Sequence, residues 1–230
     1  MVNVTGASRG IGKTIALTFA KAGATLVLAA RTEDDLLRVA STIEGMGCHV
    51  LPIRADVTVE RDVSAMITAT LNRFGRVDIL INNAGVWMMK SLQDTSLADW
   101  ERLLNLNVTG VFLCSRAVVR PMIEQGGGQI ITVASISGLE ASAMMSAYCA
   151  SKFGVVGFAR AIAEELRPYN IRVHVICPGE VANSRYDHDR RPPEELKMLS
   201  TSDVADLTLY LSTLPPHIVI DEVVIRPRKG

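Results

Sequence analysis

The chain has 230 residues, 48% of them hydrophobic, and its 24 Lys and Arg residues equal its 24 Asp and Glu residues in number. This length and apolar content suit one large domain, and the zero net charge excludes the electrostatic footprint of a nucleic-acid binder. The four cysteines form no CxxC pair, so we expect no metal site. No apolar run reaches the roughly 20 residues of a membrane span, and no signal peptide is recognisable. We therefore expect a cytoplasmic protein without a membrane contact, whose partner is a small molecule.

The first predicted unit is a strand, a glycine-rich turn and a helix. Apolar residues 1–5 lead into the sequence GASRGIG at 6–12, and helical periodicity follows to Ala22. Glycines let the backbone approach a pyrophosphate, whose charge is met by the free N–H groups of the helix N-terminus. The GxxxGxG spacing therefore indicates a phosphate-binding turn, although by itself it also suits a plain tight turn.

The second predicted strand, residues 25–30, is a continuous apolar run of the kind that parallel sheets bury on both faces. NAD-selective folds place an acid about 20 residues beyond the glycines to hold the ribose 2′-hydroxyl, whereas an Arg there accommodates a 2′-phosphate. Arg31 occupies this place, and Arg9 can offer a second guanidinium. The sequence favours NADP(H) over NAD(H); two solvated surface arginines are the alternative.

Two further strands are predicted to end at the same crevice. Residues 49–54 lead to Asp56 and Val57, where the carboxylate can contact an adenine or cap the segment after Thr58. Residues 77–81 open into Asn-Asn-Ala-Gly at 82–85, whose small and amide side chains allow a flat ligand to approach and tie neighbouring strands together.

A long helix is predicted for residues 99–124, with Asn107 and Gly110 interrupting its apolar periodicity. An Asn in the middle of a helix is usually solvent-facing, but beside a catalytic cleft it can bend the helix and hold water. The fifth strand, 129–134, ends at Ser135 and would place its hydroxyl at the cleft edge.

Tyr148 and Lys152 lie four positions apart and therefore share one face of a helix. A nearby ammonium favours the phenolate, so we expect Lys152 to lower the pKa of Tyr148 and make the phenol a usable acid and base. Ser135 would converge on the same point. A buried Tyr beside a solvated Lys is the alternative for this common pattern.

The remaining elements complete a regular alternation. A sixth strand at 171–176 ends in Pro178 and Gly179, a helix starts at 202, and a final strand spans 218–225. The polar stretch 180–200, with one short helix, is predicted to be a substrate lid, or else a surface excursion. Strand and helix alternate throughout without a linker, so we predict one α/β domain over residues 1–230, a three-layer doubly wound (Rossmann-type) sheet of about seven parallel strands.

These motifs together resemble those of the short-chain dehydrogenases/reductases over essentially the full length of the chain. Residues 5–12 are similar to the TGxxxGxG of that family, residues 82–85 to its NNAG, and Tyr148 with Lys152 to its YxxxK. Ser135 stands at the usual interval before the tyrosine, and Asn107 has an Asn-Val-x-Gly setting. Several motifs in the right order make chance an unattractive explanation.

The resemblance implies a catalytic tetrad. Tyr148 would be the acid and base, Lys152 would bind the nicotinamide ribose and lower the pKa of the tyrosine, Ser135 would steady the substrate oxygen, and Asn107 would hold a relay water. Hydride would pass between the nicotinamide of NADP(H) and a carbonyl carbon. The family is commonly tetrameric through two long helices, which implies a homo-oligomer, a dimer or a tetramer.

The same resemblance predicts a set of cofactor-binding residues along the whole crevice. These are Gly6, Ser8, Arg9, Gly10, Ile11, Gly12, Arg31, Asp56, Val57, Asn83, Ala84, Gly85, Tyr148, Lys152, Pro178, Gly179 and Val181. Two positions depart from the family pattern. Asn3 takes a place in the first strand that is usually apolar, and Asn183 stands where a Thr often contacts the carboxamide.

The function predicted from the sequence is an NADP-dependent carbonyl reductase, or an alcohol dehydrogenase in reverse, acting on a small ketone, aldehyde or 3-oxoacyl group. A 3-oxoacyl-[acyl-carrier-protein] reductase is the nearest alternative, and Arg116 and Arg120 on one helix face are candidates for receiving an acidic carrier. A non-catalytic NADP(H)-sensing scaffold is an alternative of another class. Such a scaffold is expected to lose Tyr148, Lys152 or Ser135, and this chain keeps all three.

Overall fold

A parallel sheet lies at the centre of the molecule. The computed structural model describes residues 1–182 and 198–228, and within them seven strands pair in the order β3-β2-β1-β4-β5-β6-β7. They are β1 (Val2–Thr5), β2 (Leu26–Ala30), β3 (Val50–Arg54), β4 (Ile79–Asn82), β5 (Gly128–Val133), β6 (Ile171–Pro178) and β7 (Glu222–Ile225). The strand order reverses between β1 and β4, so the carboxyl ends of these strands border the place where such sheets bind ligands.

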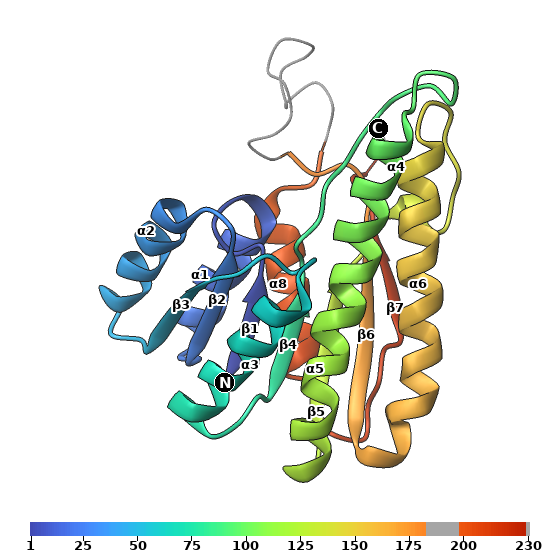
Figure 1. Cartoon of the computed structure of the whole chain (residues 1–230). Helices are drawn as coiled ribbons and strands as arrows, with labels where there is room; N and C mark the ends of the chain where they lie inside the picture. The colour runs from blue at the N-terminus through green and yellow to red at the C-terminus, as the bar shows by residue number, and fades with distance from the viewer. Residues whose placement is uncertain (183–197, 229–230) are drawn as a thin grey trace.

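Helices cover both faces of the sheet and make three layers (Figure 1). α1 (Gly10–Lys21), α2 (Glu33–Glu44) and α8 (Thr201–Ser212) pack on one face, and α3 (Glu60–Phe74), α5 (Gly110–Glu124) and α6 (Ser146–Leu166) pack on the other. The short elements are α4 (Leu97–Leu104), η1 (Asn105–Thr109), η2 (Ile136–Gly138) and η3 (Arg167–Tyr169). The predicted doubly wound single domain is confirmed.

Side-chain alternation along β2 explains why the chain has two cores. Leu26 and Leu28 lie in the core beneath α1, whereas Val27 and Ala29 lie in the core on the opposite face. Successive residues of a strand point to opposite faces, so a strand covered on both sides must be apolar throughout. The unbroken apolar run in the sequence thus places β2 in the middle of the molecule.

Asn3 is the polar exception in β1, and it is fully buried. Its Nδ2 donates a hydrogen bond of 3.1 Å to Thr70 Oγ1, but its Oδ1 has no hydrogen-bond partner. A buried carbonyl without a partner destabilises a fold by about 1–3 kcal/mol. The expected cost of a polar residue at this position is therefore present.

The long helical segment predicted for residues 99–124 is present, and it is irregular around Asn107, where the sequence predicts an interruption. α4, η1 and α5 form a continuous helical stretch, Leu97–Glu124, in which η1 is a π-helix. By length and composition alone this stretch could cross a membrane, a test that core helices of soluble proteins also pass, and 44% of its most apolar window is buried inside the protein.

The last strand is shorter than the predicted residues 218–225, because it begins at Glu222. Side chains of β6 take the carbonyl groups of the segment before it. Arg172 Nη1 donates to the carbonyls of Leu214, Pro215 and Ile218, and His174 Nδ1 lies 2.8 Å from the carbonyl of Ile220. These bonds fix the segment before β7 against β6. Most of the predicted lid at 180–200 lies outside the described residues.

Candidate active site

A crevice opens at the carboxyl ends of β1 to β4, and most of the predicted cofactor-binding residues line it. Those from the prediction are Gly6, Ser8, Arg9, Gly10, Ile11, Gly12, Arg31, Asp56, Val57, Asn83, Ala84 and Gly85. Five further lining residues were not predicted from the sequence, namely Ala29, Ala30, Thr32, Ala55 and Leu106. Four of these are strand-end or loop neighbours of predicted residues, and Leu106 belongs to η1.

The glycine turn brings the backbone of α1 close to the ends of β1 and β4. A Cβ atom on Gly12 would lie 2.3 Å from both Asn83 Nδ2 and the carbonyl oxygen of Gly6. Gly6 itself adopts a φ of 66°, a left-handed conformation that favours glycine. Both positions therefore require a residue without a side chain.

The N-terminus of α1 is suited to an anion. Arg9 precedes the helix without a side-chain capping bond, and no acidic residue lies in the first turn. α4 and α8, by contrast, have capping boxes, and α2 carries three acids in its first turn. The N–H groups of α1 and the positive end of its dipole are thus directed at the crevice, where they fit a dinucleotide phosphate.

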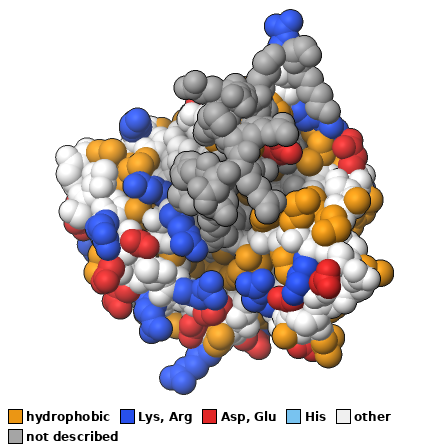
Figure 2. Space-filling view, turned by 90° about the horizontal axis from the view of Figure 1, so that it is seen from above, with side chains coloured by type: hydrophobic (Ala, Val, Ile, Leu, Met, Phe, Trp, Pro, Cys, Tyr) orange, Lys and Arg blue, Asp and Glu red, His pale blue; other side chains and the backbone are white. Residues whose placement is uncertain are grey.

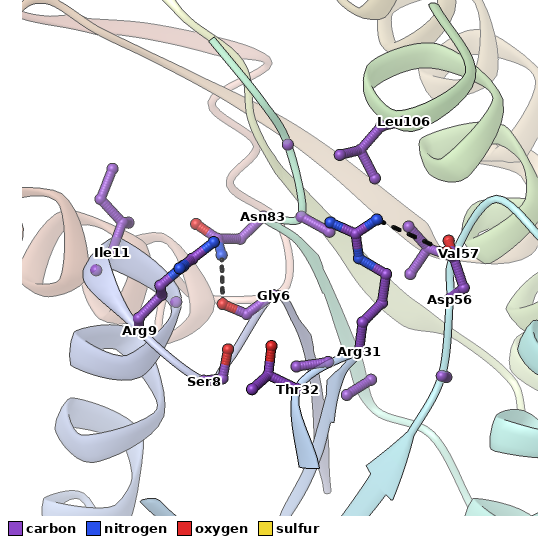
Figure 3. Close-up of a pocket in the computed structure, with 17 residues that line it drawn as sticks. Gly6, Ser8, Arg9, Ile11, Arg31, Thr32, Asp56, Val57, Asn83 and Leu106 are labelled. Carbon is purple, nitrogen blue, oxygen red and sulfur yellow. Dashed lines mark hydrogen bonds and ion pairs between the residues drawn. The ribbon is translucent and has the colours of Figure 1, made fainter. Parts of the chain in front are cut away.

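Two arginines flank the hydroxyl groups of Ser8 and Thr32 at the outer end of the crevice (Figure 3). Thr32 precedes α2 but makes no capping bond with its side chain, so its hydroxyl is not committed to the helix. Arg31 Nη1 lies 3.8 Å from Asp56 Oδ2, and 63% of the arginine side chain is exposed. Such exposed pairs contribute less than about 1 kcal/mol, so a phosphate can compete for Arg31.

Asp56 lines the crevice but does not cap the following helix, because α3 begins after Val59 without a side-chain capping bond. Its Oδ1 accepts hydrogen bonds from the backbone N–H and the hydroxyl of Thr58, at 2.9 and 2.7 Å, and so fixes the turn after β3. Its Oδ2 faces Arg31 across the crevice. The residue is a turn-forming carboxylate and a crevice-lining one at once.

Asn83 ties β4 to β1, as expected for the Asn-Asn-Ala-Gly segment. Its Nδ2 donates to the carbonyls of Thr5 and Gly6, at 2.9 and 3.3 Å, and its N–H donates to Thr5 Oγ1 at 3.0 Å. These bonds join the carboxyl ends of β1 and β4, where the strand order reverses.

Tyr148 and Ser135 meet beside the crevice. Tyr148 lies in the first turns of α6 with only 8% of its surface exposed, and Ser135 is the N-terminal cap of η2, where its Oγ accepts a bond from Ser137 N at 3.1 Å. Burial raises the pKa of Tyr148, and a hydrogen bond with Ser135 acts in the opposite direction. The net direction is opposite to the lowering expected from the sequence, and Lys152 is not among the groups that shift this pKa in the described structure.

Lys152 is buried on the next turn of α6. Its Nζ lies 5.8 Å from the centre of the Tyr148 ring and donates a 3.4 Å bond to the carbonyl of Val133. Burial lowers the pKa of Lys152 to about 8. A Cβ atom on Gly85 would lie 3.8 Å from this Nζ, so the lysine reaches the lining of the crevice.

Asn107 lies in the π-helix η1, and the side chain is held by protein groups. Its Nδ2 donates to Val86 O and Ser151 Oγ, at 3.0 and 2.9 Å, and its Oδ1 accepts from Val86 N at 2.8 Å. Both amide hydrogens are thus used, so the side chain positions Val86 and α6, and a relay water at Asn107 stays a prediction. π-Helical turns of this kind are frequent at functional sites.

Besides Tyr148 and Lys152, three predicted cofactor residues are not part of the crevice lining. Pro178 pairs with Ile225, Gly179 N donates to the carbonyl of Ile225 at 2.8 Å, and Val181 forms a bridge with Leu199. Asn183 lies outside the described residues. Arg116 and Arg120, the candidate carrier-binding residues, are paired with Glu60 and Glu124 on the protein surface.

Comparisons with known proteins agree with this geometry. A family model described as short chain dehydrogenase matches residues 1–195. The chain is 36% identical over 191 residues to a 3-oxoacyl-[acyl-carrier-protein] reductase of Synechocystis, covering 83% of this chain and 77% of the relative. A short-chain type dehydrogenase/reductase from Mycobacterium marinum superposes with a TM-score of 0.92 at 38% identity, over 98% of this chain and 93% of the other. A metagenomic short-chain oxidoreductase in complex with NADP superposes with a TM-score of 0.87 at 33% identity. The match covers 100% of this chain and 98% of the other.

Proposed function

The chain belongs to the short-chain dehydrogenase/reductase family, and from this premise we propose that it is an NADP(H)-dependent oxidoreductase that interconverts a carbonyl and a secondary alcohol. One observation carries the proposal. The side chains of Ser135 and Tyr148 meet beside buried Lys152, and Lys152 reaches Gly85 in the lining of the dinucleotide crevice.

The proposed chemistry assigns one task to each side chain. Bound NADP(H) supplies or accepts the hydride. In reduction, the hydroxyl of Tyr148 gives its proton to the oxygen of the carbonyl as negative charge develops there, and Ser135 donates a hydrogen bond to the same oxygen. Because burial raises the pKa of Tyr148, the phenol holds its proton at neutral pH and is available as the acid.

Lys152 would hold the nicotinamide ribose and supply positive charge beside the phenolate that remains after proton transfer. The pKa of Lys152, lowered to about 8, leaves the amine mostly protonated at pH 7. An ammonium at this distance stabilises an anion far more in a dry site than in water. Asn107 acts indirectly, by fixing Val86 and Ser151 around the two catalytic turns of α6.

NADP(H) is the proposed cofactor. Arg31 stands where NAD-selective folds have an acid, and Arg9, Ser8 and Thr32 surround the same end of the crevice (Figure 3). A structural relative that holds NADP supports the same choice. A ribose 2′-phosphate would replace the weak ion pair between Arg31 and Asp56 with shorter charge-assisted hydrogen bonds.

The test is NADPH oxidation with a panel of ketones, aldehydes and 3-oxoacyl thioesters. Tyr148→Phe removes only the hydroxyl, so turnover should fall by about two to four orders of magnitude while NADPH binding persists. Tyr169→Phe is the matched control, because Tyr169 is 48% exposed at the far end of α6. Full activity of Tyr148→Phe would refute the acid and base assignment.

A 3-oxoacyl-[acyl-carrier-protein] reductase is the second candidate, favoured by the identity to the Synechocystis relative. Arg116 and Arg120 are already paired with Glu60 and Glu124, so an acidic carrier protein would have to compete with these carboxylates for the two arginines. Comparing kcat/KM for a carrier-bound 3-oxoacyl group with that for its small thioester decides between them, because only a carrier reductase gains from the protein. NADPH binding without turnover of any carbonyl would instead support a non-catalytic sensor.

We also propose that the enzyme is a cytoplasmic homo-oligomer, a dimer or a tetramer. Phe112 of α5 and Phe153 of α6 are 38% and 46% exposed, so these neighbouring helices present apolar side chains to solvent. All four cysteines are free, as in a reducing compartment. Light scattering should find a species larger than 24.9 kDa, and a charged residue in place of Phe153 should reduce its mass.

A further inference from the structure

We infer that the substrate carries its carbonyl on a bulky, uncharged apolar body. The inference rests on the proposed function and deepens it, because it concerns the surface next to Tyr148. Two segments form this surface, which we call the methionine wall: residues 86–89, with Val86, Trp87, Met88 and Met89, and residues 144–145, both methionines.

The wall is in contact with the proposed acid. Tyr148 belongs to a small buried cluster with Leu103 and Ala147, and Val86, Met88 and Met145 pack against that cluster. The rest of the wall is open to solvent, because Trp87 is 50% exposed, Met89 55% and Met144 47%. Figure 2 shows hydrophobic side chains on this upper face of the molecule on the side of α4 and α6. Large apolar side chains that are exposed to solvent and clustered at one place indicate a binding surface.

Hydrogen bonds hold the first segment at both ends. At one end, Val86 is bound through its N–H and its carbonyl by the side chain of Asn107. At the other end, Lys90 N donates a 2.6 Å bond to the carbonyl of Met144. The wall is therefore a fixed feature of the same framework that positions α6.

Met144 adopts a φ of 64°, a left-handed conformation that side-chain-bearing residues rarely take. The bond from Lys90 stabilises this conformation and turns the chain sharply just before Tyr148. Backbone strain of this kind persists where the surrounding structure imposes it, and it clusters at ligand-binding sites. Here its effect is to set two consecutive methionines beside the proposed acid.

The charge near the wall argues against an anionic substrate. Within residues 86–90 and 142–146 the one cation is Lys90, whose Nζ lies 2.7 Å from Asp99 Oδ2. The hydrogen bond from Lys90 lowers the pKa of Asp99 to about 2, so this carboxylate is ionised beside the ammonium at neutral pH. A carboxylate placed on the wall would lose water without gaining that ammonium. Thioether side chains, in contrast, adapt to apolar bodies of different shape and contact aromatic rings favourably.

The experiment measures kcat/KM with NADPH for 2-alkanones of four to eight carbons and for 2-oxo acids of the same lengths. The alkanone series should rise about three- to fourfold for each added methylene, the gain for burying that group. Each 2-oxo acid should be at least about tenfold poorer than its matched ketone. The double variant Trp87→Ala/Met89→Ala should flatten the rise. Leu37→Ala/Met46→Ala, which removes similarly exposed side chains near α2, should leave it unchanged.

NADPH affinity, measured for every variant, reports whether the fold is retained, and the comparison of ketones with oxo acids needs no variant. A flat alkanone series, or a preference for 2-oxo acids, would overturn the inference and leave the proposed function standing. NADPH binding without reduction of any carbonyl would overturn both.

Discussion

Replacing Lys152 by methionine should stabilise the protein at neutral pH and should remove a rise in stability at alkaline pH. The reason is the location of the amine. Lys152 is 7% exposed, and the hydrogen bond that it makes within the described residues, to the carbonyl of Val133, is long at 3.4 Å. The buried charge is thus poorly compensated, and methionine has a similar length without the charge.

The size of the effect follows from the pKa of the amine. Burial lowers the pKa of Lys152 from 10.5 to about 8, which corresponds to about 3 kcal/mol at about 1.4 kcal/mol for each tenfold change. Between these pH values the unfolded chain binds more protons than the folded chain, so the stability of the parent rises with pH across this window. Below pH 8 both states are protonated, and the full cost of the buried ammonium is present.

Urea unfolding of parent and variant between pH 6.5 and 10, at one protein concentration, tests this reasoning. The advantage of Lys152→Met over the parent should shrink by about 2 to 3 kcal/mol across the range. Lys21→Met removes an exposed ammonium from α1 and is the control for a change in net charge. Parallel pH profiles for Lys152→Met and the parent would refute the buried-charge argument.

Three further changes test other parts of the structure. Arg31→Asp should weaken NADPH relative to NADH by at least about tenfold in Kd, because it replaces the proposed phosphate contact by a repulsion; an unchanged ratio would place the phosphate elsewhere. Asn3→Val should stabilise the fold by about 1 kcal/mol in urea unfolding, because it removes a buried oxygen without a partner. Asn82→Val should destabilise the fold, because it breaks the 3.0 Å bond to Ser115. If both variants changed the free energy of unfolding in the same direction, this account would be contradicted. Gly12→Ala should abolish NADPH binding in titration calorimetry because its Cβ has no space, while Gly157→Ala, with nothing within 4 Å, should preserve it and add about 0.5–1 kcal/mol of stability.

The sequence predicts those features that depend on local residue type or on side-chain period. The apolar run of β2 indicates a strand covered on both faces, and the glycines at 6–12 indicate a close approach of backbone, which Gly12 fulfils. Tyr148 and Lys152 share a helix face because their spacing dictates it. Ser135 follows β5 directly, so its arrival at the same edge of the sheet is also foreseeable.

Features that depend on contacts between residues far apart in the sequence could not be predicted from it. Burial is the largest influence on the pKa of Tyr148 and raises it, and the sequence does not give this burial. The segment before β7 is bound by side chains of β6 more than 40 residues away, contacts that the local sequence does not reveal. Thr32 had one signal that could have been used, a hydroxyl directly after Arg31 at the expected start of a helix.

The π-helix η1 also places a limit on how this chain can change in length. Five residues there make the wide turn, and removing one of them would restore an ordinary α-helix from Leu97 to the end of α5. α4 would then rotate by about 100° relative to α5, the angle between successive residues of an α-helix. Leu103 would leave its place beside Tyr148, and Asn107 would leave Val86. Point substitutions in this stretch can be absorbed locally, whereas a single deletion would misalign acid, coenzyme and substrate surface together.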